Sequence, residues 1–324
     1  MIEVLEPGLL TTVQDLGRPG WGHLGVPTAG AADPWSMAVA NALLANAPGV
    51  AALEVMLTGP RLRAHRVLDV AIAGADLRAT AGGHPISPGR AVRLEPGEEL
   101  TVPGPPVRGG ARAYVAVAGG IDVPAVLGSR STCLGASFGG IEGRSLRAGD
   151  RLTATAGGGR TIDAWPGEPI APRIMDRDGT VVVRVLPRPS TAPEVTSTTW
   201  IVSAASDRMG LRLDGDGRQQ TGADGELPSH GVVRGTIQVP PDGRPIILHA
   251  DHQPTGGYPV AGVVITADLP SLGQLAPGDR LRFERVDLTA AQAALVEQRA
   301  AWAAAVAVLR ADAGWDDLWR SAGG

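Results

Sequence analysis

The sequence predicts a mainly β protein with two related β lobes, few helices and a C-terminal helix. Short apolar runs recur between turn residues, and 45 glycines and 27 prolines supply frequent turns while interrupting long helices. A short sequence motif recurs near the end of each half of the chain, as SLRAGDRLT at 145–153 and QLAPGDRLRF at 274–283. The repeated motif indicates an internal repeat, with an N-terminal β lobe at 1–165, a C-terminal β lobe at 166–286, and a helix and tail at 287–324.

Strands are expected at the apolar runs. In chain order these are 67–74, 91–102 and 111–119 in the first lobe and 180–186, 245–251 and 260–266 in the second. Runs of this length, separated by turn residues, are typical of compact all-β or barrel-like domains.

Two helices interrupt this pattern. The first is expected near 34–46, because Asp33 is a good N-cap residue and Pro34 suits the first helical position. The second is expected from Thr289, with Gln292 completing a capping box, and its alanine-rich sequence favours helix to about residue 311.

Composition excludes several function classes. All 29 basic residues are arginines, so the chain has no lysine for a Schiff base, a phosphate-binding loop or an attached biotin. The net charge is −4 and there is no dense basic run, which argues against nucleic acid or an anionic membrane as a partner.

Other features suggest a cytoplasmic protein. Cys133 is the only cysteine, so no intrachain disulfide is expected. The N-terminus carries Glu3 and Glu6 where a signal peptide would be positively charged. Glu297 and Arg299 interrupt the most apolar stretch, so it is not expected to span a membrane.

The segment 11–36 is the first candidate for a site. Asp15, Arg18, His23 and Asp33 lie close to five glycines, which let a backbone approach a ligand, and arginine offers a fork suited to carboxylate or phosphate. The alternative is a structural loop held by an Asp15–Arg18 pair before a capped helix.

The segment 228–259 is the second candidate. Its QPTGGYP loop follows an apolar strand and can present side chains and backbone N–H groups to a ligand. The alternative is a tight glycine turn with Tyr258 packed on the core. No metal site is predicted, because His249 and Asp251 would face one side of a strand and His252 the other.

Two shorter segments complete the candidates. In 129–144, Arg130, Ser131 and Thr132 could bind an anion, whereas GASFG at 135–139 lacks the following helix of a nucleophile elbow. In 203–213, Arg208 either forms a surface pair with Asp207 or points into a cleft between the lobes.

These four segments together resemble the family of the 5-oxoprolinase C subunit. It is also described as the Kip antagonist or allophanate hydrolase subunit 2-like family, and it corresponds to the A–B half of the urea carboxylase carboxyltransferase domain. The shared segments run in order from about residue 3 to 285: TTVQDLGRPGWGHLGVPTAGAAD, GSRST with GGIEGRSLRAGD, SDRMGLRL, and ELPSHGVVRGTIQVPPDGRPIIL followed by TGGYP and DLPSLGQLAPGD. His252 and Pro254 depart from it, since the family commonly has arginine and threonine there.

The resemblance implies two cyclophilin-like β-barrel lobes and a partner, the B subunit, which is Kip inhibitor-like. With the A subunit, the implied assembly opens the lactam of 5-oxoproline, its small-molecule substrate, to glutamate at the expense of ATP, which acts with magnesium at the level of the complex.

On this basis we expect Arg18, Arg130 and Arg208, with the Gly256–Gly257 backbone, to line an anion-binding cleft. The expected catalytic residues are Asp15, Arg18, Arg208 and Tyr258. The expected substrate-binding residues are His23, Arg130, Ser131, Gln238, Asp251, Thr255, Gly256 and Gly257.

Two other function classes stay open. One is a carboxyltransferase component that moves a carboxyl group from a biotinylated partner to an amide such as urea. The other is a regulatory binding protein that antagonises a kinase inhibitor. Allophanate hydrolase itself is disfavoured, because its Ser-Ser-Lys centre needs a lysine.

Overall fold

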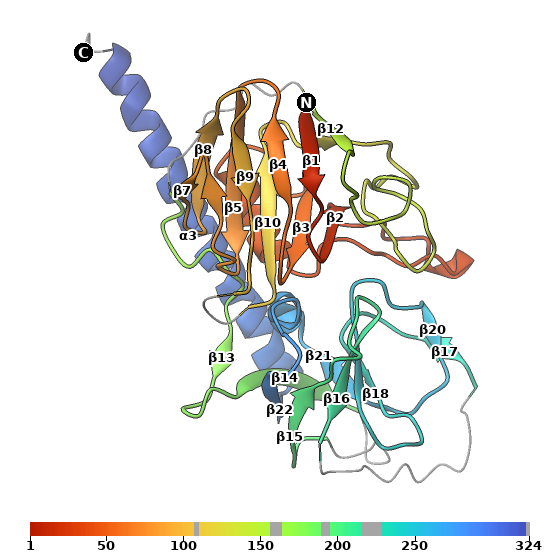
Figure 1. Cartoon of the computed structure of the whole chain (residues 1–324). Coiled ribbons are helices and arrows are strands. Elements are labelled where there is room, and N and C mark those ends of the chain that lie inside the picture. The colour runs from red at the N-terminus through yellow and green to blue at the C-terminus, as the bar shows by residue number, and fades with distance from the viewer. Residues whose placement is uncertain (107–109, 156–163, 189–194, 216–227, 322–324) are drawn as a thin grey trace.

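The computed structural model describes residues 1–106, 110–155, 164–188, 195–215 and 228–321, with side chains as far as Leu309. Two β lobes lie one above the other, and a long C-terminal helix runs alongside both (Figure 1). The expected fold class, mainly β with few helices and a C-terminal helix, is confirmed.

The N-terminal lobe is built from two antiparallel sheets. One has the strand order β11 (Ile121–Asp122), β12 (Arg151–Ala154), β1 (Ile2–Glu6), β4 (Arg61–Ala64), β9 (Glu99–Thr101), β6 (Thr80–Ala81) and β7 (His84–Pro85). The other has the order β2 (Leu10–Gln14), β3 (Ala52–Met56), β10 (Arg112–Val117), β5 (Leu68–Gly74) and β8 (Arg90–Leu94). The expected run 91–102 is therefore two strands in different sheets, separated by a turn in which the Glu98 amide bonds to the Glu95 carbonyl at 3.0 Å.

Strand β10 is buried on both faces because two different layers cover it. Val115 and Val117 face the core between the sheets. Tyr114 and Ala116, which alternate with them, face a second cluster that includes helix α1 (Pro34–Ala42). The strand therefore carries side chains to the lobe interior on one face and toward the helical layer on the other.

The C-terminal lobe contains a closed seven-stranded barrel. Its strands follow the order β14 (Val181–Pro187), β21 (Val260–Val264), β18 (Thr236–Gln238), β19 (Ile246–Leu248), β16 (Gly210–Asp214), β15 (Thr199–Val202) and β22 (Arg280–Arg285). Parallel pairing of β22 with β14 closes the ring, and β13 (Ile174–Met175) extends β14. A separate ribbon pairs β17 (His230–Gly231) with β20 (Thr255–Gly256).

The internal repeat is visible at the turns that precede β12 and β22. Gly149 and Gly278 both have positive φ, +88° and +92°. Their amides donate to Val4 and Val202, the former on β1 and the latter on β15, each at 2.8 Å. In each half, the turn therefore contacts the strand that pairs antiparallel with the strand it precedes, which agrees with the repeated sequence motif.

The N-cap prediction for α1 is confirmed, since Asp33 accepts a hydrogen bond from the Ser36 amide at 3.0 Å. The helix ends at Ala42, earlier than the predicted 46. Helix α3 spans Leu288–Ser321 and differs more from expectation. Asp287, rather than Thr289, caps it by accepting from the Ala290 amide at 2.7 Å, and the helix extends past residue 311.

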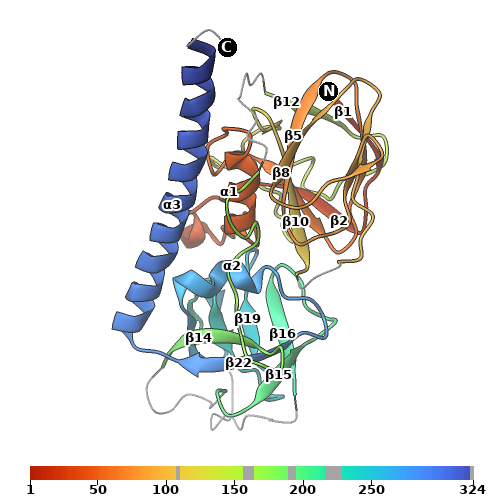
Figure 2. The same cartoon turned by 90° about the vertical axis from the view of Figure 1, so that its left-hand side faces the viewer.

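Helix α3 contacts both lobes (Figure 2). Gln298 donates to the carbonyl of Ala267 at 2.8 Å, in the 3₁₀ turn η2 (Thr266–Asp268) of the C-terminal lobe. Trp302 packs against Trp35 and Trp165, with ring centroids 5.4 Å and 5.2 Å away. The helix therefore contacts η2 of the C-terminal lobe and α1 of the N-terminal lobe.

Two short elements complete the fold, η1 (Gly22–Leu24) and α2 (Leu269–Leu272). In the part of the chain that the structure describes, no helix combines the length and apolar character needed to cross a membrane.

Candidate functional site

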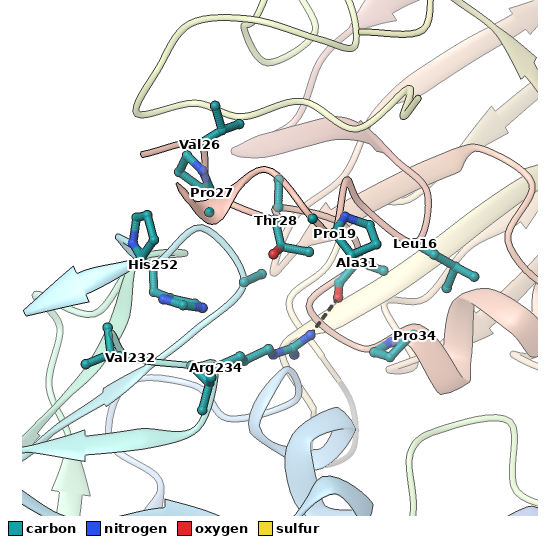
Figure 3. A pocket seen from close by; sticks show the side chains of 16 residues that line it. Leu16, Pro19, Val26, Pro27, Thr28, Ala31, Pro34, Val232, Arg234 and His252 are labelled. Atoms are coloured by element: carbon teal, nitrogen blue, oxygen red, sulfur yellow. Dashed lines mark hydrogen bonds between the residues drawn. The ribbon is translucent and has the colours of Figure 1, made fainter. Parts of the chain in front are cut away.

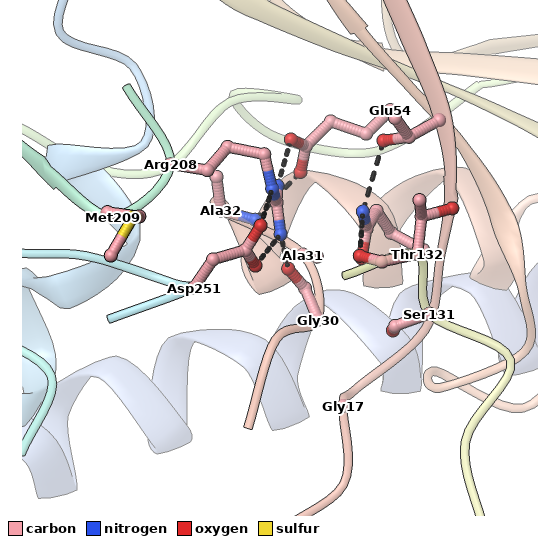
Figure 4. Close-up of polar contacts among 12 residues, drawn as sticks. Gly17, Gly30, Ala31, Ala32, Glu54, Ser131, Thr132, Arg208, Met209 and Asp251 are labelled. Atoms are coloured by element: carbon pink, nitrogen blue, oxygen red, sulfur yellow. Dashed lines mark hydrogen bonds and ion pairs between the residues drawn. The ribbon is translucent and has the colours of Figure 1, made fainter. Parts of the chain in front are cut away.

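Arg208 is the centre of a buried ionic cluster between the lobes (Figure 4). Its Nε and Nη2 atoms donate to the two carboxylate oxygens of Asp251 at 2.9 and 2.8 Å. Its Nη1 atom pairs with Glu54, and Nη2 also donates to the Gly30 carbonyl at 2.6 Å. Because Glu54 and Gly30 belong to the N-terminal lobe, this guanidinium joins the two lobes.

Glu54, on β3, is the carboxylate that receives Arg208 from across the interface. It also accepts hydrogen bonds from the Ala32 amide and the Tyr114 hydroxyl, both at 2.7 Å, and lies 3.5 Å from Arg112 Nε. Burial acts to raise the pKa of Glu54, but Arg208 and Arg112 outweigh burial and lower that pKa. The side chain is therefore ionised at neutral pH.

A second polar contact links the lobes beside this cluster. Gln274 of the C-terminal lobe donates to Asp33 at 2.7 Å, and Arg112 donates to the Gly273 carbonyl at 2.6 Å. A Cβ atom on Gly273 would lie 2.3 Å from the Ala32 carbonyl oxygen. The lobes therefore approach so closely here that only glycine fits.

Of the two sequence interpretations, the surface pair of Arg208 with Asp207 is wrong, and Arg208 lies between the lobes. It is 4% exposed and its charge is already neutralised by Glu54 and Asp251, so it offers no free guanidinium to a ligand. Asp207 does not pair with it on the surface; its carboxylate accepts from the amides of Met209 and Gly210 at 2.8 and 3.1 Å. Asp251 fixes the guanidinium of Arg208 within the C-terminal lobe, and Arg208 joins that lobe to Glu54 and Gly30.

Asp15 organises a loop rather than pairing with Arg18. Its carboxylate accepts from the amides of Gly17 and Arg130 at 2.7 and 2.6 Å, and from the hydroxyls of Ser129 and Ser131. These bonds hold the chain after β2 against the segment 129–131, so the two sequence candidates are adjacent in space.

Arg18 is 1% exposed, and it also serves this loop. Its guanidinium donates to the carbonyls of Ser131 and Val126 and lies 4.8 Å from the centroid of the Phe138 ring. Burial lowers the pKa of Arg18. The expected cleft lined by Arg18, Arg130 and Arg208 is therefore not formed, because two of these arginines are buried among protein partners and Arg130 pairs with Asp122 at 3.7 Å on the surface.

The remaining predicted residues lie around the ribbon and the first loop. Gln238 is buried on β18, directly under Gly256, where a Cβ would lie 2.3 Å from its Nε2 atom. Thr255 is exposed, and Gly257 and Tyr258 are half-buried. His23 is exposed, and its Nδ1 contacts the Gly20 carbonyl at 3.0 Å.

A cavity of about 440 Å³ lies between the lobes (Figure 3). One wall is the segment 16–34 of the N-terminal lobe and the other is formed by 232–234 and 250–254 of the C-terminal lobe. None of the twelve predicted site residues lines it, although several are sequence neighbours of residues that do. Its polar side chains are those of Thr28, Arg234 and His252.

Sequence reasoning missed Arg234 and Glu54. Each is a charged residue inside an apolar run, VVRGTI and ALEVM, and such a residue is an indication of a buried polar contact. Arg234 donates to the carbonyls of Ala31, at 3.2 Å, and Ala32 across the interface, and to that of Leu269.

The cavity does not fit ATP with magnesium. No carboxylate lines it, so it offers no anionic ligand to Mg²⁺, and Arg234 is its only cationic side chain. Among the described residues, no group of three His, Cys, Asp or Glu side chains is placed to hold a metal ion.

Comparisons with known proteins agree with this architecture. The family described as carboxyltransferase domain, subdomain A and B, matches residues 24–285. The 5-oxoprolinase C subunit of Escherichia coli is 35% identical over 306 residues, covering 92% of this chain and 96% of that protein. The urea amidolyase of Lachancea kluyveri is 33% identical over 324 residues, covering 92% of this chain but 18% of that protein.

Among solved structures, the urea carboxylase of Kluyveromyces lactis superimposes with a TM-score of 0.79 at 31% identity, covering 90% of this chain and 28% of that chain. The chain thus spans a minor part of these larger enzymes and nearly all of the bacterial protein. The family match covers most of its length, and the resemblance inferred from the sequence is confirmed. The chain belongs to the carboxyltransferase family defined by subdomains A and B.

Proposed function

We propose that this chain is the C subunit of an ATP-dependent 5-oxoprolinase that, with its A and B subunits, hydrolyses 5-oxoproline to glutamate. The observation that supports this most directly is the similarity to the Escherichia coli 5-oxoprolinase C subunit, which extends over 96% of that protein. A second relative of the same name, from Haemophilus influenzae, is 36% identical over 295 residues.

In this proposal the chain contributes a binding surface and another subunit holds ATP. The interlobe cavity lacks carboxylates for magnesium, and the chain has no lysine for a phosphate-binding loop. ATP hydrolysis supplies the free energy that opens the stable lactam. The residues of this chain bind the substrate and keep the lobes at a fixed separation through Arg208 and Arg112. We place the assembly in the cytoplasm, where ATP is available.

A carboxyltransferase role is the second candidate. The matches to urea amidolyase and urea carboxylase favour it, at 33% and 31% identity. It requires a biotinylated partner, because this chain has no lysine to which biotin could be attached. A purely regulatory binding role would produce a complex with a protein like the B subunit but no turnover.

The deciding experiment measures glutamate release from 5-oxoproline and ATP by this chain co-purified with its A and B subunits. Each of the three proteins is omitted in turn. We expect turnover only with all three. A folded assembly that releases no glutamate would contradict the proposal, and carboxylation of urea with a biotinylated carrier would then establish the second candidate.

A further inference from the structure

Arg234 is a half-buried cation, and among the described residues no carboxylate pairs with it. Its guanidinium donates to three backbone carbonyls, those of Ala31, Ala32 and Leu269. Desolvation lowers the pKa of Arg234 to about 10. Arg208 differs, because two carboxylates compensate its charge. A charge partly withdrawn from water without a counter-ion is costly, so the cavity beside Arg234 favours an anionic occupant.

His252 supplies a hydrogen-bond acceptor to the same cavity. Its Nδ1 atom lies 2.7 Å from the Gln253 carbonyl oxygen, which can only accept, so Nδ1 carries the proton. Burial, with the nearby positive charge of Arg234, lowers the pKa of His252 and keeps the ring neutral. Nε2 therefore presents a lone pair, and among the described residues nothing donates to it.

The two groups lie on the same wall of the cavity. Figure 3 shows Arg234 and His252, both from the C-terminal lobe, facing Pro27, Thr28 and Ala31 of the N-terminal lobe. The facing wall is mostly apolar and suits methylene groups. The cavity therefore combines a cationic donor, a neutral acceptor and an apolar surface.

We propose that this cavity binds a small ring compound through its carboxylate, which Arg234 receives, and an adjacent ring N–H, which donates to His252 Nε2. This inference rests on the proposed function and deepens it. In 5-oxoproline the carbon that bears the carboxylate is bonded to the lactam nitrogen, so the two groups occur side by side. Urea has no carboxylate and lacks the charged half of this pattern.

The test measures binding by the complete assembly without ATP, using equilibrium dialysis with radiolabelled 5-oxoproline and unlabelled competitors. One competitor, 2-pyrrolidinone, lacks the carboxylate. Another, 5-oxotetrahydrofuran-2-carboxylate, has a ring oxygen in place of the N–H. We expect each competitor to bind at least about tenfold more weakly than 5-oxoproline, which corresponds to about 1.4 kcal/mol of binding free energy. The first competitor loses the hydrogen bond to the charged guanidinium of Arg234. The second leaves the acceptor of His252 unpaired.

Three variants separate the two contacts. Arg234→Met is expected to weaken the binding of 5-oxoproline about tenfold to a hundredfold and to leave the binding of 2-pyrrolidinone unchanged. His252→Phe is expected to abolish the preference for the lactam over the lactone. Arg244→Met is the matched control, because Arg244 is an exposed arginine of the same lobe, paired with Asp214 at 3.0 Å; it should bind as wild type.

Two results would overturn the inference. In the first, Arg234→Met binds 5-oxoproline with wild-type affinity, or loses affinity for 2-pyrrolidinone as much as for 5-oxoproline; Arg234 would then only support the fold. In the second, His252→Phe still prefers the lactam over the lactone. The second result can be obtained even if Arg234→Met does not fold. If the assembly still converts 5-oxoproline, either result refutes this inference alone; absence of both binding and turnover in wild type refutes the proposed function as well.

Discussion

Replacing Arg208 by methionine removes the charge at the centre of the interlobe cluster while keeping a side chain of similar length. Asp251 would lose both of its bonds to the guanidinium, at 2.9 and 2.8 Å, and stay buried without a counter-ion. Glu54 would keep its bonds to Ala32 and Tyr114. Removing one partner of a buried pair costs about 3–5 kcal/mol, so we expect the free energy of unfolding to fall by that amount at neutral pH.

Urea unfolding followed by tryptophan fluorescence measures this effect, since Trp200 is fully buried in the C-terminal barrel. The double variant Arg208→Met with Asp251→Asn removes the isolated charge and should recover most of the lost stability. Arg208→Lys keeps the charge without the forked geometry of the guanidinium, so its stability should lie between those of the wild type and Arg208→Met. A loss below about 1 kcal/mol in the single variant, or a double variant no more stable than the single, would refute the reasoning.

Three further predictions concern the interface. Gly273→Ala should lower the free energy of unfolding by about 1–3 kcal/mol, because its Cβ would lie 2.3 Å from a backbone oxygen. Gly231→Ala is the control, since its Cβ would meet nothing within 4 Å. Equal melting temperatures for the two variants would contradict this prediction. The stabilisation from ionised Glu54 is complete above the ordinary pKa of 4.5 and is lost as the pH falls through its lower folded-state pKa. In Glu54→Gln, the stability measured by urea midpoints should therefore change less with pH in the acid range. An unchanged slope would exclude this role for Glu54. Trp302→Ala should lower the free energy of unfolding by about 3 kcal/mol and remove the near-ultraviolet circular dichroism of the packed tryptophans. An unchanged spectrum would show that the contact is not maintained in solution.

Local sequence signals predicted much of the fold. The Asp33–Pro34 start of α1 depends on residues next to one another, and the turns at Gly149 and Gly278 depend on a short motif, so both could be recognised without the structure. The closure of the barrel could not, because parallel pairing of β14 with β22 joins segments far apart in the chain and leaves no periodic signature.

The site was harder to predict for the same reason. The sequence next to Arg208 suggests Asp207 as a partner, whereas its actual carboxylate partners, Asp251 and Glu54, lie 43 and 154 residues away. Arg234 was overlooked because nothing adjacent to it suggests a ligand; its significance comes from the cavity that the opposite lobe completes. Predictions based on adjacent residues therefore named segments beside the cavity, whereas the side chains that line it belong to other residues of those segments.

The path of α3 has a mechanical consequence. The helix is attached to the C-terminal lobe near Gln298 and to the N-terminal lobe through Trp302, so it acts as a splint across the joint. Any hinge motion that opened the lobes would have to slide one tryptophan past another and break a buried ion pair at the same time. The lobes are therefore held against opening at two separate places, on α3 and at the Arg208 cluster.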